Sequence, residues 1–346
     1  MEPALRSVLD ASPPQRILVM GREHIGDLVN TTGALLQLRK RFPRAHMVLE
    51  CGERAVGVFE NFPGLDEVWS RPTHQGLAGK IAFVQRVKAV NFDLGIILDD
   101  SNTYIHLLSL AKVPMRVGVF KSKRRKLFTA CVPFDPAGHD LFDPLRGVLG
   151  LLGIEEPDLA PRVFPSNADR GAALAALSET GWDQRTPLVG LCPGASMPEK
   201  QWPPERFAQV AGSLQAHTVV FGSRSERELA DHIGRPWVAG LDSVLSFASA
   251  IGLCDVIVTN DSGPAHLASA VDTPAVVIYG PSDPVRFHPY SRSAVLLRGN
   301  NNCDLYRRQC EARLSGEPCD GRCLRRVEVH EVVTSVASLL ESKRMK

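Results

Sequence analysis

The chain has 346 residues, of which 44% are hydrophobic and 23% are charged, and its formal net charge is +2. This composition excludes an intrinsically disordered chain, and the near-neutral charge gives no indication of nucleic-acid binding. A single hydrophobic core rarely grows beyond roughly 250 to 300 residues, so the length predicts two domains. The first 16 residues lack the apolar centre of a signal peptide, and no apolar run reaches the roughly 18 residues of a membrane span. We therefore expect a cytoplasmic protein.

The first half of the chain alternates short apolar strands with helical segments. An apolar strand over residues 17–20 leads through a glycine-containing turn into an amphipathic helix over residues 28–38. The same pattern returns in a strand at 45–50, a helical stretch at 56–61 and a strand at 92–98. Alternation of this kind predicts a parallel sheet with helices on both faces.

The second half repeats the alternation after a proline-containing region at 153–187, which carries an alanine-rich helix over 169–179. Strands are predicted at 188–192, 218–221, 256–259 and 275–279, and helices at 204–214, at 226–233 and from Pro264 onward. The predicted organisation is an α/β domain over residues 1–160, a second over 161–326, and a C-terminal amphipathic helix over 327–346 that packs back on the first. Both domains are expected to be doubly wound, with ligands bound in a cleft beyond the strand ends.

The first strand-to-helix turn runs from Gly21 to Asp27 and lacks the GxGxxG pattern of dinucleotide-binding enzymes. Hydride transfer therefore loses its best support in the sequence. Asp27 stands at the start of the following helix, where it can act as a general base toward a hydroxyl group. An acid at this position is also favoured by the helix dipole alone, and the turn by itself leaves the two interpretations open.

Two loops of the second half are suited to a diphosphate. The loop 193–203 combines small residues, including Ser196, with Lys200, which can neutralise a leaving phosphate. The segment 260–267 begins a helix whose free N–H groups and dipole form an anion site around Asp261, Ser262 and Gly263. A solvated lysine and an acid that only caps the helix are the alternatives, while His266 is expected to be a packing residue.

Four motifs together resemble the ADP-heptose:lipopolysaccharide heptosyltransferase family, glycosyltransferase family 9. They are Ile25-Gly26-Asp27 with Thr31-Thr32, Pro193-Gly194-Ala195-Ser196, Lys200-Gln201-Trp202-Pro203, and Asp261 through Leu267. The resemblance spans most of the chain and implies a GT-B fold, in which two Rossmann-like domains face a central cleft. It also implies inverting transfer from a nucleotide diphosphate sugar without a cofactor at the chemical step.

The resemblance also assigns roles to individual residues. Asp27 matches the family's proposed catalytic base, and Lys200 and Asp261 match residues that contact the donor. In the loop after strand 218–221 this chain departs from the family's usual acid, and two alternatives stay open: Glu226 makes the ribose contact, or the base and ribose contacts differ from those of the family. This position therefore supports a nucleotide diphosphate donor in general more than ADP in particular. The predicted donor-binding residues are Ser196, Lys200, Glu226, Asp261, Ser262 and Gly263.

An anionic acceptor is expected to meet basic residues of the first half. A basic run covers residues 121–126, close to Arg116. Basic side chains on a loop suit carboxylates and phosphates such as those of a lipopolysaccharide core, and they also suit a solvated loop or an anionic membrane surface. The predicted acceptor-binding residues are Thr31, Arg116, Lys123, Arg124 and Arg125.

Four cysteines, Cys303, Cys310, Cys319 and Cys323, crowd into one polar segment. Four thiolates suit a tetrahedral structural zinc or iron site, although the spacing departs from paired CxxC motifs. Free thiols are an equal alternative, and disulfides are disfavoured in a reducing compartment.

The sequence therefore predicts an inverting transferase that moves heptose from ADP-heptose to a hydroxyl of a lipopolysaccharide core or a related anionic glycan, at the inner face of the inner membrane. One alternative is a related GT-B transferase with another nucleotide sugar or a protein acceptor. Another, from a different class, is a noncatalytic sugar-nucleotide-binding scaffold.

Overall fold

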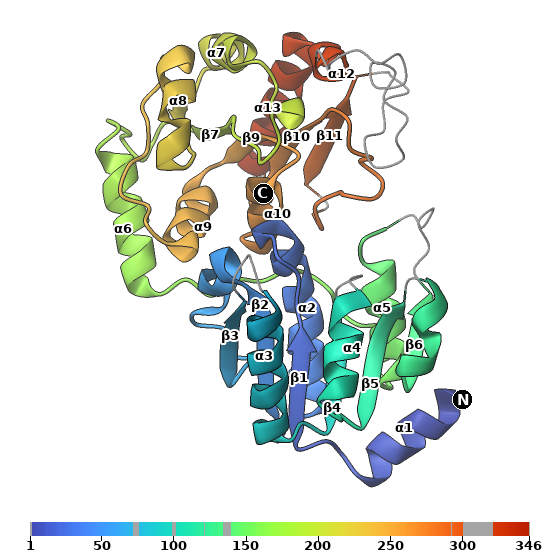
Figure 1. The fold of residues 1–346 in the computed structure, drawn as a ribbon. Helices are drawn as coiled ribbons and strands as arrows, with labels where there is room; N and C mark the ends of the chain where they lie inside the picture. Colours follow the sequence, from blue (N-terminus) through green and yellow to red (C-terminus); the bar gives the residue numbers. More distant parts are fainter. Residues whose placement is uncertain are drawn as a thin grey trace. The chain divides into compact units, whose positions relative to one another are not determined.

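A computed structural model describes residues 2–71, 76–98, 102–120, 122–133, 140–291, 293–299 and 321–345. The chain divides into two compact units, Met1–Pro161 and Arg162–Lys346. The division falls one residue beyond the boundary expected from the sequence. Each unit is built around its own parallel sheet (Figure 1).

The first unit contains a six-stranded sheet in the order β3-β2-β1-β4-β5-β6. Its strands are β1 (Arg16–Met20), β2 (His46–Gly52), β3 (Glu67–Arg71), β4 (Leu94–Ile97), β5 (Met115–Phe120) and β6 (Ala130–Pro133). Its helices are α1 (Glu2–Ala11), α2 (Ile25–Arg41), α3 (Leu77–Val90), α4 (Asn102–Leu110) and α5 (Asp143–Leu151), with 3₁₀ turns η1 (Glu53–Phe59) and η2 (Ser122–Leu127). All neighbouring strands are parallel, so both faces of the sheet need cover.

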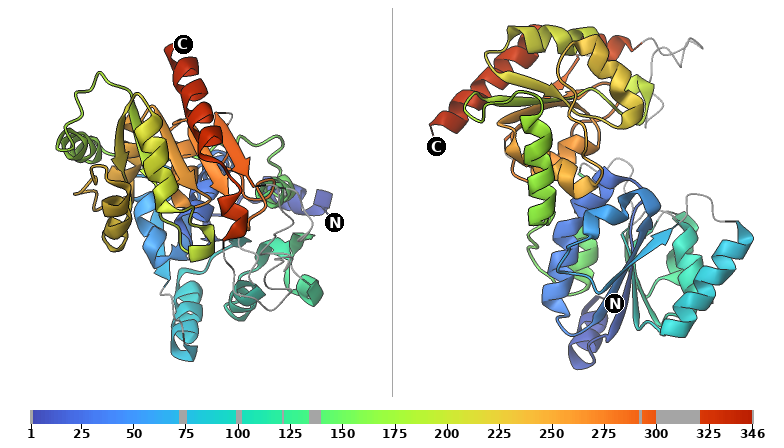
Figure 2. Two further views of the ribbon diagram at one scale, coloured as in Figure 1. Left: turned by 90° about the horizontal axis from the view of Figure 1, so that it is seen from above. Right: turned by 90° about the vertical axis from the view of Figure 1, so that its left-hand side faces the viewer.

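Apolar side chains on both faces of this sheet pack against the helices that cover it. The central strands β1 and β4 are buried almost throughout, because they are continuous runs of aliphatic residues. Helices α3 and α4 pack together on one face of the sheet, and α2 and α5 pack together on the opposite face (Figure 2). The edge-on contact of Trp69 and Phe92, with ring centroids 5.7 Å apart, belongs to the core beneath α3 and α4.

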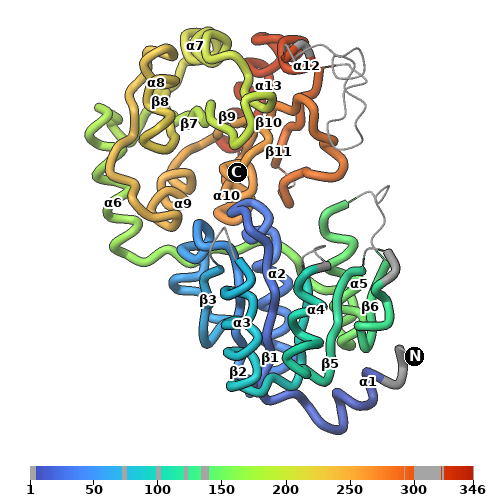
Figure 3. Tube along the Cα trace, in the orientation of Figure 1, coloured from blue at the N-terminus to red at the C-terminus, as the bar shows by residue number. Residues whose placement is uncertain are grey.

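The second unit contains a five-stranded parallel sheet in the order β11-β10-β9-β7-β8. Its strands are β7 (Leu188–Cys192), β8 (His217–Val220), β9 (Val256–Asn260), β10 (Ala275–Tyr279) and β11 (Ala294–Arg298). Its helices are α6 (Asn167–Ser178), α7 (Pro204–Ser213), α8 (Arg227–Ile233), α9 (Val244–Leu253), α10 (Gly263–Ala270), α12 (Arg322–Arg325) and α13 (Val329–Arg344), with 3₁₀ turns η3 (Pro198–Lys200) and η4 (Arg224–Glu226). Figure 3 traces the chain through these elements.

Helix α13 belongs to the second unit. It contacts α7 and strands β9, β10 and β11, and Val332 and Val336 are fully buried in the same apolar cluster as β7 and β9. The expectation that this helix also packs back on the first domain stays a prediction. Its apolar stripe fits the sheet face left open beside α7, and burying that stripe there removes it from water.

The order of the strands reverses once in each sheet. In the first unit this point lies between β1 and β4, and in the second it lies between β7 and β9. Helices leave such a point toward opposite faces, which opens a crevice at the carboxyl ends of the strands. Asp27 follows β1, whereas the loop 193–203 and Asp261 follow β7 and β9. The fold therefore puts Asp27, the loop 193–203 and Asp261 at the two reversal points.

The predicted α/β class with two doubly wound sheets is confirmed. Local differences remain: the helical stretch expected at 56–61 is the 3₁₀ turn η1, and neither helices α1, α3, α4, α5, α9 and α12 nor strands β3, β5, β6 and β11 were predicted. Asp99 and Asp100 lie outside the described residues. The cleft expected between the domains stays a prediction.

Replacing Gly33 with alanine is predicted to destabilise the first unit. A Cβ atom there would lie 2.5 Å from the backbone carbon of Leu159, which no side-chain rotation can relieve. We expect a loss of about 1–3 kcal/mol in the free energy of unfolding, measured by urea denaturation. Gly171, on helix α6, has open space around it, and Gly171→Ala should stabilise by about 0.5–1 kcal/mol. Equal effects of both substitutions would contradict this packing argument.

Candidate functional site

Asp27 lies in the first turn of α2, directly beyond the carboxyl end of β1. The N-cap residue His24 makes no side-chain capping bond, so the first turn leaves backbone N–H groups and the helix dipole to favour a carboxylate. Arg22 Nη1 lies 3.6 Å from Asp27 Oδ1, and the Asp27 side chain is 27% exposed. The carboxylate is therefore held in place yet accessible to a substrate hydroxyl.

A cavity of about 370 Å³ opens at the carboxyl edge of the second sheet. It is formed by the loops after β7 and β8, by the start of α9 and by the start of α10. Four of the six predicted donor-binding residues line it: Ser196, Glu226, Ser262 and Gly263. Phe221 and Phe247, with ring centroids 5.6 Å apart, give it an aromatic wall. The cavity thus combines an apolar side with a helix start suited to an anion.

Glu226 is held at the rim of this cavity by a reciprocal cap. Its Oε2 accepts hydrogen bonds from the backbone N–H of Ser223, at 2.7 Å, and from the Ser223 hydroxyl, at 2.8 Å. A Cβ atom on Gly194 would lie 1.9 Å from Glu226 Oε1, so a larger residue would displace the carboxylate from this position. The fixed carboxylate can accept hydrogen bonds from vicinal hydroxyl groups such as those of a ribose.

Lys200 and Asp261 form an ion pair beside the cavity. Lys200 Nζ lies 2.7 Å from Asp261 Oδ2, and the two side chains are 11% and 6% exposed. Neither residue lines the cavity itself. The pair joins the loop after β7 to the loop after β9, so each charge that was predicted to face the donor neutralises the other. This arrangement places a nearly buried cation next to the start of α10.

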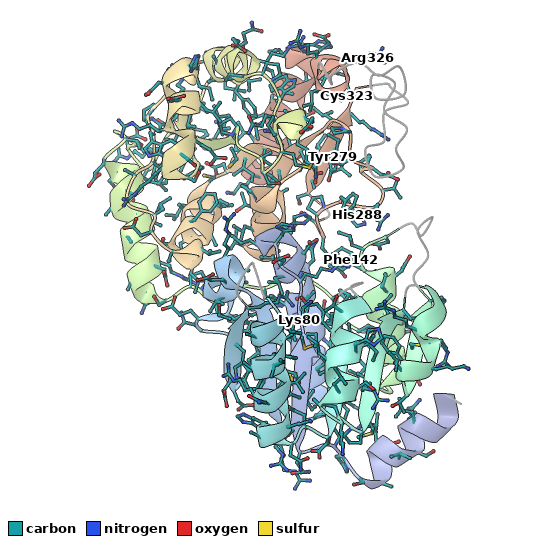
Figure 4. All side chains as sticks on the ribbon, in the orientation of Figure 1. Lys80, Phe142, Tyr279, His288, Cys323 and Arg326 are labelled. Carbon is teal, nitrogen blue, oxygen red and sulfur yellow. The ribbon has the colours of Figure 1, made fainter. Side chains whose placement is uncertain are left out.

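Tyr279 lies at the end of β10 (Figure 4). Its hydroxyl donates to the carbonyl of Phe287 at 2.9 Å, and Lys200 Nζ lies 5.8 Å from the centre of the Phe287 ring. Burial, reinforced by the charge of Asp261, raises the pKa of Tyr279 well above its usual value. The phenol therefore stays neutral and keeps its donor hydrogen at physiological pH.

Asn260 was missed by the sequence analysis, although a polar residue at the end of an apolar strand was a usable signal. It is fully buried. Its Nδ2 donates to the Pro193 carbonyl at 2.6 Å, and its Oδ1 accepts from the Trp202 backbone N–H at 3.0 Å. One side chain therefore fixes both ends of the loop that carries Ser196 and Lys200. Since Asn260 immediately precedes Asp261, it also sets the spacing across the ion pair.

The predicted acceptor residues are placed unequally. Thr31 is 2% exposed and its hydroxyl donates to the Leu28 carbonyl, while the Arg116 guanidinium donates to the carbonyls of Leu127 and Val113. Burial lowers the pKa of Arg116. These two side chains are used internally, so their placement does not support acceptor contact. Arg124 is exposed and Arg125 is half-buried on η2, whereas the side chain of Lys123 lies outside the described residues.

The predicted metal site falls mostly on residues that are not described, since Cys303, Cys310 and Cys319 lie outside them. Cys323 lies on α12 and is 1% exposed within the apolar cluster of the second unit (Figure 4). Within the described part of the chain, no group of three or more histidine, cysteine or acidic residues could hold a metal ion. A zinc or iron site at this segment stays a prediction.

Two doubly wound parallel sheets, with a base candidate after β1 and an anion-binding cavity in the second unit, define the class of GT-B-type nucleotide-sugar transferases. A family model described as glycosyltransferase family 9 (heptosyltransferase) matches residues 80–314. The chain belongs to this family and is a glycosyltransferase. Among the described helices, none is long and apolar enough to cross a bilayer.

Comparison with individual proteins agrees. The chain is 26% identical over 305 residues to lipopolysaccharide heptosyltransferase 2 of Salmonella typhimurium, covering 82% of this chain and 88% of the relative. The crystal structure of a family 9 glycosyl transferase from Veillonella parvula matches with a TM-score of 0.84 and 26% identity, over 95% of this chain and 98% of that one. The Escherichia coli ADP-heptose lps heptosyltransferase II has the same fold, with a TM-score of 0.75 and 22% identity over 95% and 99% of the two chains.

Replacing Asn260 with leucine, which has a similar volume, is predicted to loosen the loop 193–203. The substitution leaves the Pro193 carbonyl and the Trp202 N–H without their buried partner, at about 1–3 kcal/mol for each orphaned group. We expect a lower midpoint of thermal unfolding and faster hydrogen exchange at the Trp202 amide. Ser178→Ala removes a surface hydrogen bond to Leu174 and should change stability by at most about 0.5 kcal/mol. Unchanged exchange at Trp202 in the leucine variant would contradict the assigned role.

Proposed function

We propose that this protein transfers heptose from ADP-heptose to a hydroxyl group of a lipopolysaccharide core, with inversion at the anomeric carbon. The observation that carries the proposal is the second-unit cavity, which is lined by a fixed acid, Glu226, and by the start of α10, and beside which lies the nearly buried Lys200. The names of the relatives supply the sugar and the acceptor: one is a lipopolysaccharide heptosyltransferase, and another carries ADP-heptose in its name.

The base of the proposed reaction is Asp27. Its carboxylate takes the proton of the acceptor hydroxyl as that oxygen attacks the anomeric carbon. The bond between this carbon and the donor phosphate breaks, and its electron pair leaves with the diphosphate. Attack and departure occur on opposite faces of the carbon, which accounts for inversion. No cofactor takes part in this step.

The leaving diphosphate is the second centre of charge. Negative charge grows on it in the transition state, where a fixed cation and backbone N–H groups are most effective. Lys200 and the N-terminus of α10 at Ser262 and Gly263 supply these groups. Asp261 holds the lysine beside the cavity, because Lys200 Nζ donates to Asp261 Oδ2 at 2.7 Å. Because the pair is neutral overall, the amides of α10 are expected to provide much of the attraction for the donor before reaction.

The acceptor side is proposed to use Arg124 and Arg125 of η2, together with Lys123. An acceptor rich in phosphate and carboxylate groups binds arginine through paired hydrogen bonds. The same basic segment suits an anionic membrane surface, at about 1 kcal/mol for each basic side chain near it. We therefore place the reaction at the cytoplasmic face of the inner membrane, where a lipid-linked acceptor would be presented.

Replacing Asp27 with asparagine is predicted to lower kcat for heptose transfer by about 10²- to 10⁴-fold, because the amide cannot accept the proton. The dissociation constant for ADP should stay unchanged, since the donor cavity lies within the second unit. Transfer to purified lipopolysaccharide acceptor lacking heptose is the assay. Glu23→Gln removes an exposed carboxylate from the same turn and should leave kcat near wild type. Full activity in Asp27→Asn would rule out this base.

Replacing Lys200 with methionine is predicted to weaken ADP binding about 10- to 100-fold, because a charge-assisted contact is lost and Asp261 is left unpaired beside the phosphates. Calorimetric titration should give the double variant Lys200→Met/Asp261→Asn an ADP affinity between those of wild type and the single variant, since it removes the repelling carboxylate.

UDP and GDP should bind wild type more weakly than ADP. Tighter UDP or GDP binding would indicate another donor, and absence of nucleotide binding would contradict the proposed function.

A further inference from the structure

A buried ion pair also lies in the first unit, in addition to the pair of Lys200 and Asp261 in the second unit. It involves neither the proposed base nor the residues of the donor cavity. Arg71 Nη1 lies 2.8 Å from Glu50 Oε2, and the two side chains are 5% and 3% exposed. Glu50 belongs to β2 and Arg71 ends the neighbouring edge strand β3. The guanidinium also stacks over the Tyr104 ring, 4.6 Å from its centre. A glutamate inside the otherwise apolar run of β2 is a local departure from the pattern of a buried strand.

Stability does not explain this pair. Removing two charges from water costs several kcal/mol for each ion, and apolar residues of similar volume often stabilise a core as well or better. Among the described residues, the Arg71 Nε atom has no hydrogen-bond partner, so they do not satisfy the guanidinium fully. A buried pair with this cost is more readily understood if it holds something in place.

What Arg71 holds is the turn after β1. Its Nη2 donates to the Gly21 carbonyl at 3.1 Å, while the Gly21 N–H donates to the Glu50 carbonyl at 2.7 Å. Further along the turn, the Gly52 N–H donates to the Arg22 carbonyl at 3.2 Å. A Cβ on Gly52 would lie 2.6 Å from the Glu23 carbonyl oxygen, so the end of β2 and the turn are in close contact.

This turn leads directly to the proposed base. Arg22, whose carbonyl is bonded to β2, places its guanidinium 3.6 Å from the Asp27 carboxylate. Asp27 itself is the third residue of α2, six positions after Gly21. A shift of the Gly21 carbonyl therefore changes both the start of α2 and the position of Arg22. The ends of β2 and β3 hold the geometry on which the base depends.

We propose that Arg71, oriented by Glu50, is a positioning residue for Asp27. This inference rests on the proposed function, in which Asp27 is the base. Glu50 selects one orientation of the guanidinium, Tyr104 supports its plane, and the remaining arm of the fork fixes the Gly21 carbonyl. Arginine suits this role because one planar group can serve a carboxylate and a carbonyl at once. Lysine, with a single compact ammonium, cannot reproduce that geometry.

The test separates positioning from folding by removing both charges together. Arg71→Met alone leaves the Glu50 carboxylate buried without the guanidinium that it faces, so it is expected to lower the midpoint of thermal unfolding. The double variant Glu50→Leu/Arg71→Met replaces the pair with apolar groups of similar volume and should recover much of that midpoint. It still lacks the bond to the Gly21 carbonyl. Its kcat for heptose transfer should therefore fall about 10- to 100-fold, with the KM for ADP-heptose within about twofold of wild type.

Control variants distinguish a failure of the positioning role from a failure of the proposed function. Asp143→Asn/Arg146→Gln removes an exposed ion pair of α5 in the same unit and should leave kcat unchanged. A stable Glu50/Arg71 double variant with wild-type kcat would overturn the positioning role while leaving the proposed function intact. Parallel loss of kcat and of ADP affinity would also overturn it, because the donor cavity belongs to the other unit. Absence of heptose transfer by the wild-type protein would instead contradict the proposed function itself.

Discussion

Every strand in both sheets runs parallel to its neighbours, and the position of the site follows from this constraint. Parallel strands require helical returns, so each sheet is covered on both faces and its polar loops gather at the carboxyl edge. Where the strand order reverses, neighbouring loops separate and leave a crevice. Asp27 occupies that position in the first unit, and the loops proposed to bind the donor occupy it in the second. The proposed chemistry is thus carried by short loops on rigid strands.

In both units, buried polar groups bond to these loops and fix their positions, in addition to apolar contacts. Asn260 bonds both ends of the loop 193–203, and the pair of Lys200 and Asp261 crosses between the same two loops. In the first unit, Glu50 and Arg71 restrain the turn before Asp27. Such groups are expensive to bury, but a fully directional bond fixes an orientation that apolar contacts leave adjustable. Buried polar groups that bond to a loop therefore support both the proposed base and the proposed leaving-group side.

Sequence patterns identified the functional loops better than they identified the contacts within them. Asp27, Lys200 and Asp261 were expected at strand ends and are found there, because apolar runs and glycine-containing turns are local properties. That Lys200 and Asp261 would neutralise each other was not visible, since they are 61 residues apart and meet only through the pairing of β7 and β9. Thr31 and Arg116 show the converse: their side chains are used within the fold.

The sequence by itself determined the fold class, the family and the turns proposed to carry the chemistry, because strand and helix periods and cap residues depend on neighbours a few positions away. Tertiary structure alone decided that α13 completes the core of the second unit and that Asn260 ties two loops together. It also decided that Glu50 meets Arg71 beneath the turn after β1. These are contacts between distant segments, and their geometry depends on the register of neighbouring strands, which no local pattern specifies.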